Sequence, residues 1–143
     1  MVELGVLNDI NWLGVLAATL AYFVLGALWY SPMLFGKRWM RAAGIAEPAE
    51  GEGPGPAIYL MPLISSLLAS VALAMIARAM NASGAGDGLE LGLIVGLGFV
   101  ISVMLTTATF ETHKSEPWMW FALTAGYHFV GVILASIIVS VLD

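Results

Sequence analysis

Four long apolar runs without charged residues dominate the pattern of hydrophobic and polar positions along the chain. They cover Asn11–Tyr30, Ala57–Ala77, Leu91–Phe110 and Pro117–Leu142. A helix rising about 1.5 Å per residue needs about 20 residues to cross roughly 30 Å of hydrocarbon, and lipid offers the backbone no hydrogen-bond partners. The pattern predicts one all-α domain over residues 1–143, an integral membrane bundle of four transmembrane helices at about 11–30, 57–77, 91–110 and 118–142.

A short segment after the first run combines aromatic rings with cations. Pro32 breaks the helix there. If residues 34–44 form a helix, its aromatic rings and its cations lie on different faces. The residues of this pattern are Trp29, Tyr30, Phe35, Lys37, Arg38, Trp39 and Arg41. We expect a short interfacial amphipathic helix after the first span, which anchors the chain at the headgroups. A specific lipid-binding site is the alternative role.

The remaining connectors are polar. Residues 45–56, IAEPAEGEGPGP, are rich in Pro, Gly and Glu and predict a flexible loop. Residues 81–88 and 111–116 predict tight turns, which place neighbouring helices antiparallel.

Composition agrees with lipid as the main solvent of the chain. Hydrophobic residues make up 60% of the 143 positions and charged residues 10%, with a mean hydropathy of +0.93, whereas a soluble domain carries about 25% charged residues. A signal peptide would begin with basic residues, but this chain begins MVELGVLNDI, so we expect the first run to be a retained span. The absence of cysteine excludes thiolate ligands, and no basic patch predicts binding to nucleic acid.

Cations are divided unequally between the two sides of the predicted bundle. With both termini outside, Lys37, Arg38, Arg41 and Lys114 lie in cytoplasmic connectors, and Arg78 alone lies outside. Positive charge concentrates on the cytoplasmic side of membrane proteins. We therefore expect an outside N-terminus and C-terminus, with anionic membrane lipids as partners of the cytoplasmic connectors.

The segment LWYSPMLFGKRWM, preceded by NWLGVLAATLAYFVLGA, also carries a family resemblance. It resembles the start of bacterial membrane proteins grouped as domain-of-unknown-function family 1761, most specifically over Asn11–Met40. The later stretches FETHKSEPWMW and GYHFVG fit the general pattern. The resemblance implies a small four-span protein of the bacterial cytoplasmic (inner) membrane and implies no activity.

Small residues recur every four positions in the third run, at Gly88, Gly92 and Gly96. Lipid gives helices little hydrophobic reason to associate, so close approach at small residues matters. The stripe either packs against a helix of the same chain or joins the subunits of a homo-oligomer. We expect self-association through it.

His128 is the only histidine well inside a predicted span, where no Asp, Glu, Lys or Arg lies. Such residues are functional candidates, because ionisable groups are costly in lipid. Counted from the cytoplasmic boundary, it shares its depth with polar residues of the other spans, and a Ser/Thr stripe leads from that depth towards the 111–116 connector. The candidate binding residues are Tyr22, Ser66, Ser102, Thr106, Thr109, Glu111 and His128. We predict that Tyr22, Ser66, Ser102 and His128 converge as a site for a small solute or a proton. The alternative is a structural hydrogen-bond network.

No motif identifies a reaction. The spans lack the carboxylate that couples small multidrug exporters to protons, and they lack a second histidine for haem. Glu111, His113 and Glu116 are a weak candidate for a metal site, because Lys114 balances their charge, so we expect no metal and no cofactor. Three hypotheses remain: an oligomeric transport or channel-like module, a non-catalytic interaction or scaffold subunit, and, more weakly supported, an enzyme acting on lipid.

Overall fold

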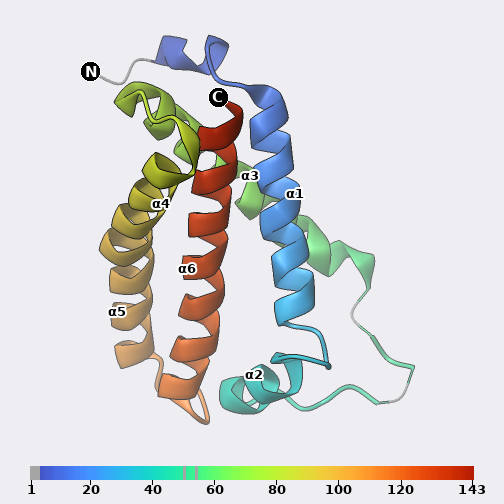
Figure 1. Cartoon of the computed structure of the whole chain (residues 1–143). Helices are drawn as coiled ribbons and strands as arrows, with labels where there is room; N and C mark the ends of the chain where they lie inside the picture. Colours follow the sequence, from blue (N-terminus) through green and yellow to red (C-terminus); the bar gives the residue numbers. More distant parts are fainter. Residues whose placement is uncertain (1–3, 50, 54) are drawn as a thin grey trace.

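The computed structural model describes residues 4–49, 51–53 and 55–143, and helices account for most of them (Figure 1). Within these residues no strand occurs, and four helical segments are long and apolar enough to cross a membrane. These segments are Trp12–Trp29, Pro56–Met80, Gly84–Phe110 and Pro117–Leu142. The predicted all-α bundle of four transmembrane helices is confirmed.

Several elements share a span. The elements in chain order are the 3-10 turn η1 (Leu4–Asn8), α1 (Trp12–Trp29), α2 (Gly36–Ala43), the 3-10 turn η2 (Pro56–Tyr59), α3 (Leu60–Met80), α4 (Gly84–Val95), the π-helical turn η3 (Gly96–Ile101), α5 (Ser102–Phe110) and α6 (Pro117–Leu142). The second span is η2 with α3, and the third is α4, η3 and α5.

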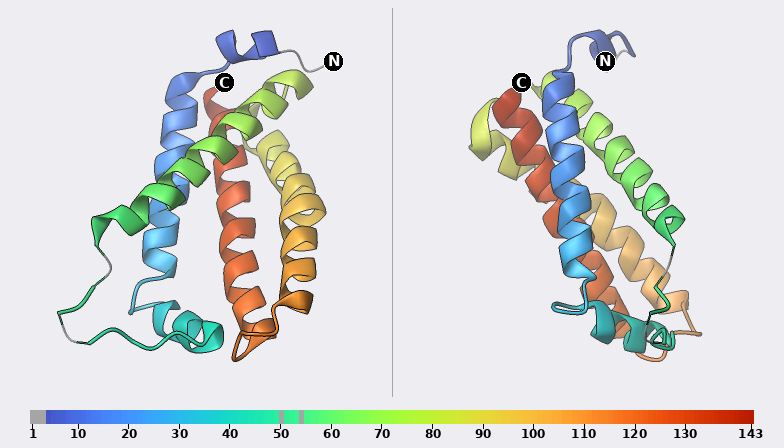
Figure 2. Two further views of the ribbon diagram at one scale, coloured as in Figure 1. Left: turned by 180° about the vertical axis from the view of Figure 1, so that it is seen from behind. Right: turned by 90° about the vertical axis from the view of Figure 1, so that its right-hand side faces the viewer.

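Helix α6 is the centre of the bundle. It packs against α1, α3, α4 and α5. The views agree that α4 and α5 lie on one side of α6 and α1 on the other, while α3 crosses the bundle obliquely (Figures 1 and 2). The turn η1 and the C-terminus lie at one end of the bundle, the terminal end, and α2 lies at the other, the α2 end (Figure 1).

The third span begins earlier than the sequence predicts. Residues 81–88 were expected to form a turn, but α4 starts at Gly84. The Asp87 carboxylate accepts a hydrogen bond from the backbone N–H of Ser83 at 2.8 Å and so satisfies a donor at the helix start. A carboxylate in the first helical turn also favours the helix dipole, and the polar residues are therefore the start of the helix.

The π-helical turn η3 changes the face that the third span turns towards α6. In a regular α-helix, positions 99, 103 and 107 would continue the face of Gly96, yet Phe99 and Val103 are 68% and 61% exposed. The turn inserts one extra residue, so the inward face continues through Val100, Met104 and Ala108 instead.

Helix α2 has the predicted amphipathic character. Ala42 and Ala43 are buried against Ala108 and Trp120, and the backbone N–H of Glu116 donates to the Ala42 carbonyl at 3.0 Å. The cations Lys37, Arg38 and Arg41 are exposed. Protein contacts with the α5–α6 connector therefore hold α2 at the α2 end, with its cations turned outward.

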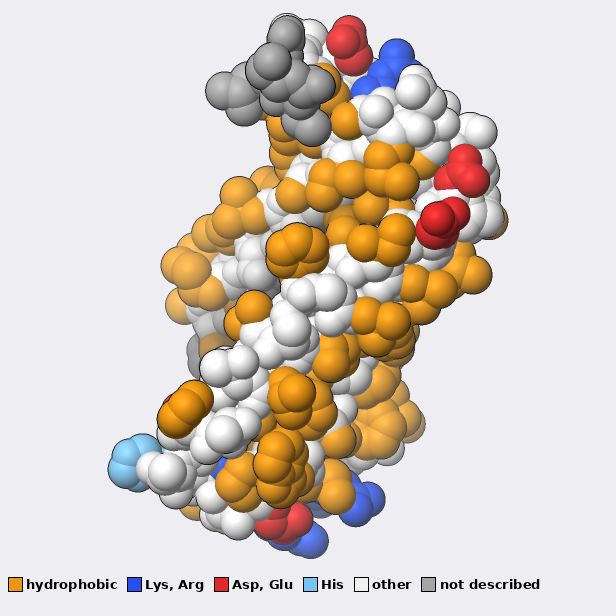
Figure 3. Space-filling view, turned by 90° about the vertical axis from the view of Figure 1, so that its left-hand side faces the viewer, with side chains coloured by type: hydrophobic (Ala, Val, Ile, Leu, Met, Phe, Trp, Pro, Cys, Tyr) orange, Lys and Arg blue, Asp and Glu red, His pale blue; other side chains and the backbone are white. Residues whose placement is uncertain are grey.

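Charged side chains gather towards the two ends of the molecule, and apolar side chains cover the region between them on the face shown in Figure 3. At the terminal end, Arg78 pairs with Asp143 at 3.4 Å, and at the α2 end, Lys114 pairs with Glu111 at 3.5 Å. Leu13, Leu68 and Phe99 are among the large apolar side chains that remain exposed. An apolar belt of this kind suits contact with lipid.

The predicted flexible loop over 45–56 forms no helix or strand in its described residues before Pro56. Positions 50 and 54 of that prediction lie outside the described residues.

Candidate binding groove

A groove with a volume of about 1120 Å³ opens at the α2 end of the bundle. Its walls come from the second half of α1, from α2 and the segment after it, from the start of α3, and from Tyr127 and His128 of α6. Mostly apolar atoms line it. The oblique course of α3 separates its first turns from α1 (Figure 2). Clefts between helices of a bundle are common ligand sites.

A hydrogen-bonded pair, Tyr22 and His128, is the deepest polar feature of this groove. The Tyr22 hydroxyl oxygen lies 2.8 Å from Nδ1 of His128 and 3.4 Å from the His128 carbonyl oxygen. Either the hydroxyl donates to Nδ1, which leaves the imidazole proton on Nε2, or Nδ1–H donates to the hydroxyl, whose proton then reaches the carbonyl. In both arrangements Nε2 takes no part in the pair and can bond a ligand.

Two glycines make room for the tyrosine rings that join α1 to α6. A Cβ added at Gly131 would lie 2.1 Å from Cε2 of Tyr22, and one added at Gly26 would lie 2.8 Å from the Tyr127 hydroxyl. Tyr22 and Tyr127 also contact each other, with ring centroids 5.5 Å apart. Each helix therefore contributes one tyrosine and the glycine that receives the partner's ring.

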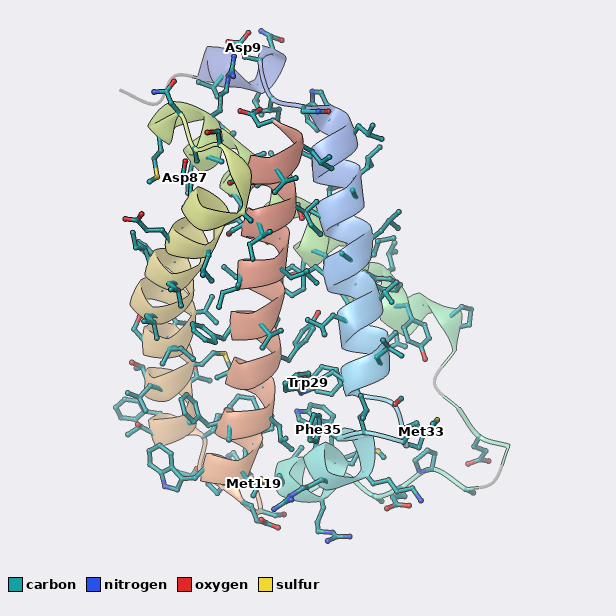
Figure 4. All side chains as sticks on the ribbon, in the orientation of Figure 1. Asp9, Trp29, Met33, Phe35, Asp87 and Met119 are labelled. Atoms are coloured by element: carbon teal, nitrogen blue, oxygen red, sulfur yellow. The ribbon has the colours of Figure 1, made fainter. Side chains whose placement is uncertain are left out.

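Indole N–H groups attach aromatic residues of the α2 end to α6, and one of these residues, Trp39, lines the groove. Trp29 Nε1 donates to the Leu123 carbonyl at 3.0 Å, and Trp39 Nε1 donates to Thr124 Oγ1 at 3.0 Å. Trp29 and Phe35 stack obliquely with centroids 4.8 Å apart, and both lie between the end of α1 and α2 (Figure 4). These bonds satisfy part-buried donors, and the bond of Trp39 holds its ring at the groove.

The groove carries little charge. No lysine or arginine among the described residues lines it, and Glu52, which is exposed, is its only carboxylate in that part of the chain. The cations of α2 face away from it, since Gly36, Trp39 and Met40 are the α2 residues that line it. The groove is thus suited to a largely uncharged or apolar molecule.

Only part of the predicted polar layer comes together. Tyr22 and His128 form the pair described above, and Ser66 lines the same groove beside Tyr127. Ser102 does not join them, because it lies two residues from both Val100 and Met104 and so, at about 100° per residue, on the opposite side of the helix. The predicted convergence is wrong for Ser102.

The Ser/Thr stripe of α5 is exposed as well. Ser102, Thr106 and Thr109 each donate to the carbonyl four residues earlier. Ser102 and Thr106 line a shallow depression of about 460 Å³ that reaches Glu111, on the outer face of the helix. The stripe does lead towards Glu111, but outside the bundle. A binding role for these residues stays a prediction.

The glycine stripe of the third span packs inside the chain. A Cβ at Gly88 would lie 2.6 Å from the Ile137 Cα, one at Gly92 would lie 2.7 Å from the Ile133 Cα, and one at Gly96 would lie 2.6 Å from the Phe129 ring. Because α6 occupies this face, the expected self-association through the stripe is wrong. The same-chain alternative holds.

Sequence reasoning missed Tyr127 and the contribution of α2 and Ser65 to the groove. Tyr127 adjoins His128 and lies four residues before Gly131, as Tyr22 lies four residues before Gly26. This shared spacing of a tyrosine and a glycine was the signal in the sequence. The groove itself depends on the tilt of α3, and no residue pattern reports that tilt.

The described residues contain no group of three or more His, Cys, Asp or Glu side chains that could hold a metal ion. No curated protein and no solved structure matches the chain. The model of one protein family, described as a protein of unknown function (DUF1761), matches residues 13–140. That match covers most of the 143 residues, and the chain belongs to this family.

Proposed function

We propose that the protein is a transport-type membrane module that binds a small, mostly apolar molecule in the groove between α1 and α3. The Tyr22–His128 pair at the inner end of the groove carries this proposal. It provides hydrogen-bonding capacity at a depth where lipid provides none, and polar groups at such depth characterise substrate paths.

The groove also has the dimensions and lining of a ligand site. Its volume of about 1120 Å³ is at the upper end of the range of roughly 300–1,000 Å³ that is usual for small-molecule pockets. A molecule with an apolar body and one hydrogen-bonding group would place the body against the apolar lining of the groove and the polar group on Nε2 of His128 or on Ser66.

The alternatives have less support. A dry core would favour the scaffold hypothesis, whereas a groove of about 1120 Å³ opens into this bundle. The lipid-enzyme hypothesis needs His128, or Glu111 with His113, as acid and base. Glu111 pairs with Lys114 in the α5–α6 connector, and Nδ1 of His128 is taken up by the Tyr22 hydroxyl. One chain builds the whole groove, so the binding proposal needs no second copy. Homo-oligomerisation stays a prediction that mass measurement in mild detergent can test.

Molecules retained by the protein test the binding proposal. The protein is extracted from its membrane in polymer-bounded lipid discs, and bound small molecules are identified by native mass spectrometry. The variant Ser65→Trp fills the groove from α3, whereas Leu68→Trp adds the same ring to an exposed, lipid-facing position of the same helix. We expect a molecule that wild-type and Leu68→Trp retain and that Ser65→Trp loses.

Equal retention by the two tryptophan variants would contradict binding in this groove. A retained molecule then allows the transport part to be tested. Vesicles that contain the wild-type protein should take it up at least about ten times faster than vesicles that contain Ser65→Trp.

A further inference from the structure

Most serine and threonine side chains inside the spans fall into two groups. The hydroxyls of the first group donate to the carbonyl four residues earlier in the same helix, as serine and threonine commonly do in apolar surroundings. This group consists of Thr19, Ser66, Ser102, Thr106, Thr107 and Thr109. In the second group, Ser70, Ser136 and Ser140 have buried hydroxyl oxygens with no hydrogen-bond partner among the described residues.

The second group is also the more deeply buried. Ser70 and Ser136 are 0% exposed and Ser140 is 2% exposed, whereas Ser102, Thr106 and Thr109 are exposed. A hydroxyl removed from water without a partner is destabilising. These three positions are therefore where the bundle most needs a further hydrogen-bonding group.

Two helices that pack together, α3 and α6, carry the three serines. Ser136 and Asp143 are seven residues apart and share one face of α6, and Asp143 pairs with Arg78 of α3. That face of α6 is thus turned towards α3. A Cβ added at Gly88 would lie 2.8 Å from the Ser136 carbonyl oxygen, so α4 closes the same region from the other side.

The serines also follow one another along α3 and α6, away from the groove. Ser70 is one turn from Ser66, which lines the groove, and Tyr127 of α6 lies beside Ser66. At about 1.5 Å per residue, Ser136 and Ser140 lie roughly 14 and 20 Å beyond Tyr127 along α6. The series starts at the groove and ends at the ion pair of Arg78 and Asp143 at the terminal end.

We propose that a file of water molecules occupies the interface of α3 and α6 and joins the groove to the terminal end through Ser70, Ser136 and Ser140. Water supplies both donors and acceptors, and buried water commonly satisfies polar groups that the protein leaves unpaired. The path gives the groove access to the second side of the membrane. In that role it rests on the proposed function.

Infrared spectroscopy of single-cysteine variants tests the path. The chain contains no cysteine, so one introduced thiol gives the only S–H stretching band. In full-length protein transferred to D2O, the S–H proton exchanges only where water reaches it. Ser70→Cys, Ser136→Cys and Ser140→Cys are compared with Ala135→Cys, which adjoins Ser136 on α6 and is also 0% exposed.

We expect the three serine-site thiols to exchange at least ten times faster than the thiol at position 135. The path is overturned if the thiol of Ser136→Cys exchanges at the same rate as the thiol of Ala135→Cys, whether both are slow or both are fast. If one serine variant does not fold, the other two allow the same comparison.

Replacement by alanine gives an independent measurement. Removal of a dry, unpartnered hydroxyl raises the thermal midpoint, whereas removal of a hydrated one leaves it unchanged or lowers it. We expect Ser136→Ala not to raise the midpoint, and a rise would contradict the water file. If the interface of α3 and α6 is dry but Ser65→Trp loses the ligand, the water file is wrong and binding in the groove is still supported. The failure of one proposal can therefore be told apart from the failure of the other.

Discussion

Tyr22 and Tyr127 show how single residues determine the contact between α1 and α6. Each ring lies over a glycine of the opposite helix, and the Tyr22 ring also brings its hydroxyl to His128. Small residues are favoured where membrane helices approach closely. Here the glycines receive aromatic rings, so the same residues that pack the helices also form the polar end of the groove.

The two tyrosine–glycine pairs differ in how much space they leave. Gly131→Ala places a methyl group 2.1 Å from the Tyr22 ring, and we expect this overpacking to lower the free energy of unfolding by about 1–3 kcal/mol. Gly26→Ala meets the terminal hydroxyl of Tyr127 at 2.8 Å, which a small ring movement relieves, so its effect should be smaller. Unfolding by SDS in mixed micelles measures both. A larger loss for Gly26→Ala would contradict the account.

At the scale of elements, the contact of the third span with α6 depends on how the four-residue repeat of its inward-facing residues matches the period of the helix. A repeat of four residues drifts by about 40° per step around an α-helix. From Gly88 to Ala108 the inward face keeps this repeat for five steps, a drift of about 200°, and the extra residue in η3 offsets about 100° of it. The π turn therefore keeps α4 and α5 on one face of α6.

Substitutions of two glycines in the third span should have opposite consequences. Gly92→Ala adds a methyl group 2.7 Å from the Ile133 backbone, which cannot move aside easily, whereas Gly98 has no atom within 4 Å of an added Cβ. We expect Gly92→Ala to lower the thermal midpoint in mild detergent, and Gly98→Ala to leave it unchanged or raise it. Equal midpoints for both variants would show that α4 does not depend on close approach to α6.

The elements divide into those that residue patterns predict and those that they do not. Uncharged runs predict the four spans because lipid requires helices there, and the pattern of Trp39 and Arg41 predicts α2. The Tyr22–His128 pair was predictable from depth alone. Ser102 was misplaced because depth does not determine which face of a helix turns inward, and the face of Gly88, Gly92 and Gly96 packs against α6 instead. The groove was missed because the tilt of α3 results from packing against α1 and α6.

For the whole molecule, the two ends of the bundle differ in cationic charge. Lys37, Arg38, Arg41 and Lys114 belong to the α2 end, and Arg78 to the terminal end, where it pairs with Asp143. Because cytoplasmic loops carry the excess of Lys and Arg, we predict that the α2 end faces the cytoplasm.

Reporter fusions test this orientation. A reporter that is active only in the cytoplasm should be inactive when it is fused after Asp143 and active when it is inserted into the 45–56 connector. When Lys37, Arg38 and Arg41 are replaced by Glu, the protein should insert into the membrane in both orientations. Replacement of Glu47 and Glu52 by Gln should leave the single orientation unchanged. Activity after Asp143 in the wild-type protein would refute the orientation.

The central place of α6 has a consequence for how the chain is made. Synthesis runs from the N-terminus, so the helix that α1, α3 and α4 all pack against leaves the ribosome after them. Until then, Gly88, Gly92 and Gly96 have no α6 to receive them, and α2 lacks the Glu116 backbone that binds it. The earlier helices therefore remain in the bilayer without their central partner until α6 has been synthesised and inserted. A ribosome that stops before Pro117 releases a product without a core, which membrane proteases can recognise by its unpaired helices.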